Sequence, residues 1–582
     1  MAVASAPQIV IVGGGLAGLM AAIKASEAGA EVKLFSSVPC KRSHSVCAQG
    51  GINAAVNTKG EGDSPEIHFD DTIYGGDFLA RQELPRRMAH AGPGIVYLLD
   101  RMGVRFSRTP EGLLDFRRFG GTKHHRTAFA GATTGQQLIY ALDEQVRRWE
   151  AGGHVVRYEN WEFLSAVLDG SGACRGIVAM PLSTLRPEAF RADAVILATG
   201  GPGLIFGRST NSMNCTGSAA GSVHRQGAIY ANPEFIQVHP TAVPGEDKDR
   251  LISESVRGEG GRVWVPKDGK PWYFLEEKFP KYGNLVPRDI ATREIFRVVH
   301  ELGLGVDGKA QVYLDVSHLD ASTTRRKLGG VLEIYEKFMG ADPTKVPMKV
   351  FPSVHYSMGG LWVDDADEAT NIPGLYASGE ANFQYHGANR LGANSLLSCI
   401  FGGMVCGPAA VKYARGLAKG AAALDSSVFD AARAREEEEN RKVLARDGPE
   451  NLYGLHEELG ESMRKHCTVV RYNRGLEEAE AKVADLQARL PRARVPDRSD
   501  VGNQSLVFAR QMENMLVIAR AICRGARLRD ESRGAHYKPD FPERDDVNFL
   551  KTTMARHSPD GPRIDYDPVE CTWVKPRPRK YD

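Results

Sequence analysis

Five separated segments carry side chains suited to binding an anionic substrate. An arginine can hold a carboxylate through two parallel hydrogen bonds, and a histidine can add a directed one. Each segment alone has an ordinary explanation, such as a capped loop or a surface ion pair. Together they predict a site for a substrate with two carboxylates. The residues concerned are His239 and Thr241 in QVHPTA, Ser253, Glu254 and Arg257 in LISESVRGEGG, Arg288 in NLVPRDIATRE, His355 in FPSVHYSMGG and Arg390 in HGANRLGANS.

A further histidine lies in KRSHSVCAQGG, residues 41–51, between Ser43 and Ser45 and just ahead of an Ala-Gln-Gly-Gly loop. A histidine in a loop is more often a surface or hydrogen-bonding residue than a chemical one. The segment by itself therefore favours a structural role for His44. The rest of the chain reverses that interpretation.

A glycine-rich turn near the N-terminus predicts the element that positions these groups. The apolar run QIVIV is typical of a buried strand, and GGGLAGL follows it, with Gly13, Gly15 and Gly18 in a GxGxxG pattern. Such glycines allow a tight turn that turns a helix N-terminus toward a pyrophosphate. Gly29 predicts the end of the helix before the strand EVKLF. That strand ends in Phe35-Ser36, without the acidic residue that usually binds a ribose.

Two later segments predict that this nucleotide-binding domain is interrupted. ADAVILATGG (192–201) and NIPGLYASGE (371–380) each have a short buried strand, and the second precedes the helical run SLLSCIFGGMV. A site closed by a segment so far along the chain suits FAD better than NAD. We therefore predict an α/β fold, with a Rossmann-like FAD-binding domain interrupted by an α+β capping domain and followed by a helical domain and an extended tail. The predicted boundaries are 1–235, 236–352, 353–424, 425–544 and 545–582.

Local patterns support this division. In the capping region, RVWVPKDGKPWYF predicts a hairpin that turns at Asp268-Gly269. Further on, REEEEN reads as a solvated helix face, and helical spacing from Leu476 to Leu490 predicts a helix that Pro491 ends. A second helix, SLVFARQMENMLVIARAICR, is predicted to stop at Gly525.

Composition narrows the class of function. The 582 residues carry a formal net charge of +2, which provides no general attraction for nucleic acid. The longest apolar run, residues 9–23, is shorter than the ~18 residues typical of a membrane span and lacks the features of a signal peptide. The nine cysteines include no CxxC pair, so neither an iron–sulfur cluster nor another metal site is expected on this chain. If the protein works at a membrane, another chain should hold it there.

Nine segments, in order, resemble the flavoprotein subunits of succinate dehydrogenase and quinol:fumarate reductase. They are SHSVCAQGG, ATGGPG, VHPTA, SESVRGEGG, PRDIATRE, HYSMGG, GLYASGE, GANRLGANSLL and RDESRGAHYKPDFPERDD. The sequences of the segments NLVPRDIATREIF and VHYSMGGLWVD are most similar to the branch typified by Gram-positive succinate dehydrogenases. The resemblance implies that FAD is bound covalently, through its 8α-methyl group, to His44. Such a bond raises the flavin potential enough for succinate to donate a hydride.

The resemblance also implies the remaining site residues. Ser218 stands where the family usually has an aspartate, and Ser395 is expected to open a helix whose N-terminus stabilises negative charge on reduced flavin. Phe119 and Gly50 join the residues that bind the dicarboxylate. The expected FAD contacts are Gly13, Gly14, Gly15, Leu16, Ala17, Gly18, Ser36, Ser43, Ser45, Gln49, Gly50, Gly51, Ser218, Glu380, Ser395 and Leu396.

In the chemistry that the resemblance implies, Arg288 removes a proton from succinate while a hydride leaves the adjacent carbon. Arginine is an unusual base, since its pKa is normally above ~12. The family solves this with a relay through Glu254 and Arg257, and their i,i+3 spacing suits one side of a helical turn. An ordinary ion pair is the alternative for these two residues.

The implied partners are an iron–sulfur subunit and a membrane-anchor cytochrome b subunit that reduces quinone. The chain would then be peripheral, on the cytoplasmic face of the cell membrane, with no direct insertion. Fumarate reductase, the same chemistry reversed, remains the main alternative. His44 argues against L-aspartate oxidase, whose FAD is not covalently bound. The near-neutral charge argues against an RNA-modifying flavoprotein. The complete acid–base set argues against an inert scaffold.

Overall fold

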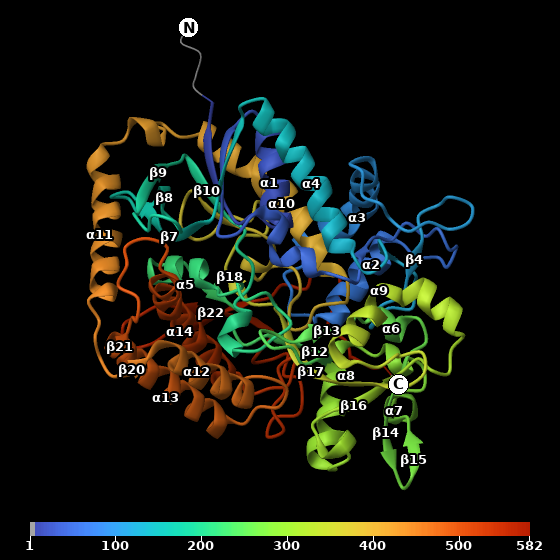
Figure 1. The fold of residues 1–582 in the computed structure, drawn as a ribbon. Coiled ribbons are helices and arrows are strands. Elements are labelled where there is room, and N and C mark those ends of the chain that lie inside the picture. The colour runs from blue at the N-terminus through green and yellow to red at the C-terminus, as the bar shows by residue number, and fades with distance from the viewer. Residues whose placement is uncertain (1–5, 582) are drawn as a thin grey trace.

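The computed structural model describes residues 6–581 (Figure 1). A five-stranded parallel sheet has the strand order β19-β10-β1-β2-β6, with β1 (Gln8–Val12) in the middle. Alternate residues of β1 enter two different hydrophobic cores: Val10 and Val12 on one face, Ile9 and Ile11 on the other. Because both faces are covered, the strand reads as a continuous apolar run.

The parallel sheet is assembled from distant parts of the chain. Strand β2 (Glu31–Ser36) lies beside β1, and β6 (Val155–Glu159) forms the next edge. On the other side, β10 (Ala194–Leu197) pairs with β1, and β19 (Leu375–Ala377) pairs with β10. The prediction of an interrupted nucleotide-binding fold is therefore confirmed. Helices α1 (Leu16–Glu27) and α10 (Asn394–Arg415) pack together beside this sheet.

The inserted region forms a six-stranded antiparallel sheet with its own core. Its order is β13-β12-β17-β16-β14-β15, and helices α8 (Arg288–Phe296) and α9 (Ala321–Met339) contribute to the same core. The predicted hairpin is present, with β14 (Arg262–Lys267) paired to β15 (Lys270–Trp272). Its turn residues Asp268 and Gly269 have φ angles of 51° and 75°, which aspartate–glycine turns favour. The remaining strands are β12 (Ile236–Val243), β13 (Arg250–Leu251), β16 (Val312–Asp315) and β17 (Met348–Ser357).

Four long helices follow: α11 (Ser426–Leu444), α12 (Leu452–His466), α13 (Asn473–Arg489) and α14 (Gln504–Leu528). Helix α13 buries the predicted stripe from Leu476 to Leu486. Two predictions need correction. Helix α14 continues past Gly525, where a side chain would meet Glu234 Oε2 at 2.9 Å, so glycine is retained for packing and not for a stop. In REEEEN, Glu436 is buried and accepts hydrogen bonds from Ser165 and Arg510.

The predicted extended tail is wrong for residues 551–568. These residues form a hairpin of β22 (Lys551–Arg556) and β23 (Arg563–Pro568), in a four-stranded sheet with β11 (Tyr230–Ala231) and β18 (Gly360–Leu361). Strand β22 is held because Thr553 N–H donates to Asn232 Oδ1 at 2.9 Å. Strand β22 pairs with β11, more than 300 residues earlier in the chain, so local sequence did not reveal that pairing.

Helix α10 is long and apolar enough to cross a membrane, although no segment of the sequence was expected to do so. Of its apolar window, 72% is buried inside the protein. Its glycines explain this burial: at Gly403 a side chain would lie 2.6 Å from Ala17 O. Helix α10 is therefore a central core helix packed closely against α1.

Candidate active site

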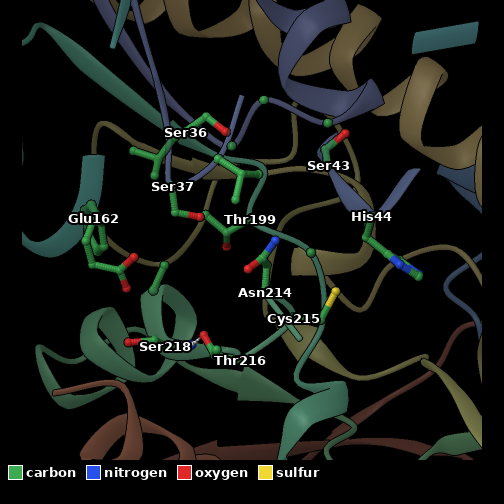
Figure 2. Close-up of a pocket in the computed structure, with 18 of the residues that line it drawn as sticks. Ser36, Ser37, Ser43, His44, Glu162, Thr199, Asn214, Cys215, Thr216 and Ser218 are labelled. Atoms are coloured by element: carbon green, nitrogen blue, oxygen red, sulfur yellow. Dashed lines mark hydrogen bonds between the residues drawn. The ribbon is translucent and has the colours of Figure 1, made fainter. Parts of the chain in front are cut away.

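A cavity of about 640 Å³ lies at the carboxyl end of the parallel sheet (Figure 2). Most of the predicted FAD contacts line it, while Gly18, Gln49, Gly50, Gly51, Ser395 and Leu396 do not. In the close-up, Ser43 and His44 lie on the right of the cavity, Glu162 lies on the left, and Thr216 and Ser218 lie below. The predicted residues that line it are Gly13, Gly14, Gly15, Leu16, Ala17, Ser36, Ser43, His44, Ser45, Ser218 and Glu380.

The glycine turn has the geometry that a diphosphate requires. Gly13 has φ +117°, and a side chain there would meet Ala198 O at 2.1 Å. A side chain at Gly18 would lie 1.8 Å from Gly13 O, so this glycine serves packing of the helix on the strand. Helix α1 has no side-chain cap at Gly15, which leaves its N-terminus facing the cavity. Anionic groups are stabilised at such a terminus.

Unpaired polar atoms on the cavity wall fit a bound nucleotide such as FAD. Within residues 6–581, the buried hydroxyls of Ser43 and Thr199 have no hydrogen-bond partner. Both residues line the cavity, so a bound nucleotide would satisfy them. Ser218 lines it too, and its Oγ accepts a hydrogen bond from Asn514 Nδ2 at 3.0 Å. The replacement of the usual aspartate thus leaves a neutral polar group on this wall.

A large part of the cavity wall consists of residues that were not predicted from the sequence. Glu162 comes from β7 (Trp161–Leu168), and burial raises the pKa of its carboxyl to about 7. Burial likewise raises the pKa of Glu380 to about 7. Thr199 belongs to the quoted ATGG segment, so that motif was the available signal. Asn214 and Thr216 lie in the segment NCTGSAAGS that contains Ser218, so that segment was the signal for them. No local signal marked Glu162 or the helical residues Tyr453, His456, Gln504 and Gln511.

His44 is a neutral, oriented imidazole. It begins the short 3₁₀ turn His44–Cys47, and its Nδ1 accepts a hydrogen bond from Ser212 N–H at 3.1 Å. Asn211 Nδ2 lies 3.3 Å from its Nε2. Burial, with the nearby charge of Lys248, lowers the pKa of His44 to about 4. The ring is therefore uncharged near neutral pH.

Glu254 joins two arginines in a buried network. Its Oε2 accepts from Arg288 Nε at 3.0 Å and Nη2 at 2.8 Å, while its Oε1 accepts from Arg257 Nη2 at 2.7 Å. The predicted geometry of the i,i+3 pair is confirmed, since Glu254 caps the short helix α6 (Ser255–Gly258) that contains Arg257. Burial would raise the pKa of Glu254, but the charges of Arg288 and Arg257 outweigh it and lower that pKa.

Two histidines and Arg390 gather beside this network. His239 on β12 and His355 on β17 lie with ring centroids 5.1 Å apart. His239 Nδ1 lies 3.2 Å from both the N–H and the carbonyl oxygen of Thr241, which orients the ring. Within the described chain, His239 Nε2 and Arg390 Nε are buried without a partner. Burial and the charge of Arg288 lower the pKa of Arg390 to about 9, and an anionic ligand would offset that effect.

Gln237 links these groups and was missed from the sequence. Its Oε1 accepts from Arg288 Nη1 at 3.0 Å, and its Nε2 donates to Arg390 O at 2.7 Å. It lies on β12 two residues before His239, so strand alternation places both on one face. Of the predicted hydroxyls, Ser253 accepts from Ser255 N–H at 3.3 Å, and Thr241 donates to Ile252 O at 2.8 Å.

The loop before β3 (Ile52–Asn53) packs against Phe119. A side chain at Gly50 would meet Phe119 Cζ at 2.8 Å, and Arg117 donates to Gly50 O at 3.0 Å. Gln49 Nε2 donates to Leu251 O at 3.1 Å, which ties this loop to β13. Gly51 has φ +145°, with Ala128 O only 2.5 Å from the position of a side chain. The loop thus forms a closely packed wall that leaves no room for larger residues.

Ser395 connects the helix start to the cationic group. Its Oγ accepts from Arg390 Nη1 at 3.2 Å. Helix α10 begins one residue earlier than expected, at Asn394, after the left-handed Ala393 with φ 65°. Leu396 is buried in the core.

The parallel sheet, the glycine turn and the uncapped helix define the class as an FAD-binding oxidoreductase fold with a site for an anionic substrate. Comparison with known proteins agrees. A family described as "FAD binding domain" matches residues 8–396, and one described as "Fumarate reductase flavoprotein C-term" matches residues 456–581. The chain belongs to the succinate dehydrogenase and fumarate reductase flavoprotein family.

Individual relatives cover almost the whole chain. It is 64% identical over 579 residues to the succinate dehydrogenase flavoprotein subunit of Bacillus subtilis, with 99% of each chain covered. It is 36% identical to the fumarate reductase flavoprotein subunit of Escherichia coli, covering 98% of this chain and 95% of the relative. A mutant E. coli quinol fumarate reductase has a similar structure, with TM-score 0.92, 34% identity and coverage of 99% and 98%. A Mycobacterium smegmatis Sdh1 structure with UQ1 gives TM-score 0.84 and 30% identity, with coverage of 97% and 95%.

Proposed function

We propose that the protein is the catalytic flavoprotein subunit of a succinate:quinone oxidoreductase and oxidises succinate to fumarate. The observation that carries this proposal is the buried Glu254 network beside two histidines and Arg390. The 64% identity to a succinate dehydrogenase subunit, against 36% for fumarate reductase subunits, favours the oxidative direction. Initial rates with succinate and with fumarate, measured at matched driving force, test this preference.

Several side chains of the site are suited to binding the two carboxylates of the substrate. Arg390 Nε and His239 Nε2 are buried without a partner among the described residues, so we assign these two side chains to hold the substrate, together with His355, Thr241 and Ser253. Phe119, backed by Gly50, would press on the carbon chain. A bound FAD would accept the hydride. This arrangement fixes the substrate before any proton moves, which lowers the entropic part of the barrier.

Arg288 is the proposed proton acceptor. Its guanidinium donates to Glu254 and Gln237, and it is the first residue of α8. The lowered pKa of Glu254 keeps its carboxylate ionised. Glu254 can therefore accept a proton from Arg288 and pass it to Arg257. Burial lowers the pKa of Arg257, which makes proton sharing easier than for an exposed arginine. These three residues form the proposed relay.

We propose that FAD is linked covalently to His44 through Nε2. In the linked ring Nδ1 keeps its lone pair, which is the atom that accepts from Ser212 N–H. With Nδ1 as the acceptor, Nε2 carries the single ring proton, which would have to leave as Nε2 bonds to FAD, and the lowered pKa keeps the ring from holding a second proton. Such a link would raise the flavin potential for oxidation of succinate.

In-gel flavin fluorescence after denaturing electrophoresis tests this bond. A fluorescent band near 63.5 kDa is expected for the wild type and for Cys47→Ser, a matched change in the same exposed turn. His44→Ser should give a dark band. A dark wild-type band from a host that flavinylates a known family member would contradict the covalent proposal and shift weight to a reductase or an L-aspartate oxidase relative.

We further propose that electrons leave through a separate iron–sulfur subunit and a membrane-anchor cytochrome b subunit that reduces quinone. The nine cysteines are free, and the Sγ atoms of Cys467 and Cys523 lie 3.7 Å apart. Residues 6–581 contain no group of three or more side chains suited to a metal ion. Relatives named quinol fumarate reductase and Sdh1 support a membrane complex. The chain would be peripheral on the cytoplasmic face. Affinity purification from native membranes, followed by iron and haem analysis, tests these partners.

A further inference from the structure

Residues 573–581, named here the strap, join two separate parts of the molecule. The strap runs from the loop between α2 (Pro65–Gly75) and α3 (Glu83–Arg101) to the start of α8. Figure 1 places this end of the chain beside α7 (Phe274–Lys278) and α8. The strap therefore reaches from the FAD-binding part to the inserted region that contains Arg288.

The strap is attached firmly on the FAD-binding side. Gln82 receives the backbone N–H groups of Trp573 and Val574 at 2.9 and 3.1 Å and donates to Val574 O at 2.7 Å. Tyr74 Oη donates to Lys580 O at 2.9 Å. These contacts include backbone groups and one buried amide, so they position the strap without depending on surface charge.

On the other side, the strap grips the first turn of α8. Arg579 donates two hydrogen bonds to the carboxylate of Asp289, Nη1 to Oδ2 at 2.6 Å and Nη2 to Oδ1 at 3.1 Å. The side chain of Arg579 is 8% exposed and that of Asp289 is fully buried. Tyr581 continues into the core of the inserted region, with its ring 5.1 Å from that of Tyr282. A buried bidentate pair has a narrow range of geometries.

The charges around Asp289 make Arg579 its principal partner. Arg293 also reaches Asp289 Oδ2, at 3.2 Å, but with one nitrogen only, and it is shared with Gly534 O. Asp77, which lies 4.0 Å from Arg579, is already paired with Arg544 at 2.8 Å. Without Arg579, the buried carboxylate of Asp289 would keep one cationic partner, Arg293, through a single hydrogen bond. Helix α8 would also lose its ion pair with the strap.

We propose that Arg579 is a positioning residue for the reaction, which holds Arg288 in place by fixing the adjacent Asp289 and the first turn of α8. This inference rests on the proposed role of Arg288. Because Arg288 and Asp289 are neighbours at the start of one helix, a shift of this turn moves the guanidinium relative to substrate. Misplacement of a reacting group by about 1 Å can cost about 100-fold in rate.

Arg579→Gln in the purified, flavin-loaded complex tests the inference, with Arg577→Gln as the matched control. Arg577 lies in the same strap and pairs with the half-exposed Asp70, and within residues 6–581 it has no hydrogen bond or ion pair with α8. We expect kcat for succinate, measured with an artificial electron acceptor, to fall about 10- to 100-fold in Arg579→Gln. The deuterium isotope effect with deuterated succinate should rise, because C–H cleavage becomes more strongly rate-limiting. Arg577→Gln should match the wild type in both quantities.

A wild-type kcat and isotope effect in folded Arg579→Gln would overturn the inference, as would equal losses in the two strap variants. If Arg579→Gln fails to fold, Arg579→Lys and Asp289→Asn provide the same test, since each keeps the size of the side chain but removes the bidentate pair. Arg288→Gln distinguishes failure of the proposed proton acceptor from failure of the positioning role. Full turnover in Arg288→Gln would refute the proposed proton acceptor itself, whereas an inactive Arg288→Gln with a normal Arg579→Gln would refute only the positioning role.

Discussion

Gly392 is the position where the smallest change should most directly disturb the proposed relay. A side-chain carbon added there would lie 2.6 Å from Glu254 Oε2 and 2.9 Å from Phe119 Cδ1. Neither neighbour is a flexible chain end, because Glu254 is held by two arginines and Phe119 packs against Gly50. Gly392→Ala must therefore displace a group of the proposed site.

The expected magnitude has two parts. Forcing an extra methyl group into a packed interior costs about 1–3 kcal/mol of stability. Restoring an ordinary contact of about 3.4 Å at Glu254 requires a shift of several tenths of an ångström, which the Arg288 hydrogen bonds at 2.8 and 3.0 Å must follow. We expect kcat for succinate to fall by about 10- to 100-fold, with the flavin still bound.

Steady-state kinetics and thermal denaturation of the same preparations measure both effects. Gly94→Ala is the matched control: Gly94 lies within α3, is exposed, and has no neighbour within 4 Å of an added side chain. That change should leave kcat unaltered and raise stability by about 0.5–1 kcal/mol, as alanine does in an open helix. A Gly392→Ala protein with wild-type kcat would refute the assignment of Glu254 to the relay at this geometry.

Three further predictions follow from the same structure. Arg288→Gln should abolish succinate turnover while flavin absorbance at full occupancy is retained; activity near wild type would contradict its role. Arg529→Met should lower the free energy of unfolding by about 3–5 kcal/mol, measured from denaturant midpoints, because it leaves the fully buried Glu531 without one of its two arginine partners. Because the pKa of Glu162 is raised to about 7 in the fold, flavin-free protein should lose stability as pH rises from about 5 to 8, by at most about 3 kcal/mol. Glu162→Gln should remove the part of this dependence that Glu162 contributes and leave the part due to Glu380, whose pKa is raised to about 7 as well. An unchanged pH profile would refute the assignment.

Local patterns predicted the elements whose signals lie within a few residues. The run QIVIV, the glycine turn, the Asp268-Gly269 hairpin and the stripe of α13 each formed as expected. The pairing of Glu254 with Arg257 was predictable for the same reason, since one helical turn brings residues three apart together. In each case, backbone geometry connects sequence spacing to position without help from the rest of the chain.

Elsewhere the predictions failed where distant partners decide the outcome. Gly525 read as a helix stop, but it is an interior residue required by the closeness of Glu234. Glu436 read as solvated, but Arg510 and Ser165 bury it. The tail read as extended, but its hairpin completes a sheet with strands far earlier in the chain. Composition could not reveal these cases, because the compensating group lies elsewhere in the sequence.

The sequence by itself determined the fold class and the family, and it predicted the residues of the site, because motif spacing and residue type suffice for those. Only the tertiary structure decided which groups act together. It brought Gln237 to Arg288 and Arg390, placed Glu162 and residues of α12 and α14 on the cavity wall, and tied Arg579 to Asp289. These contacts join segments up to 290 residues apart, and burial gives them their strength by removing water from charged pairs. Such pairing depends on how the layers pack, which no local pattern of residues records.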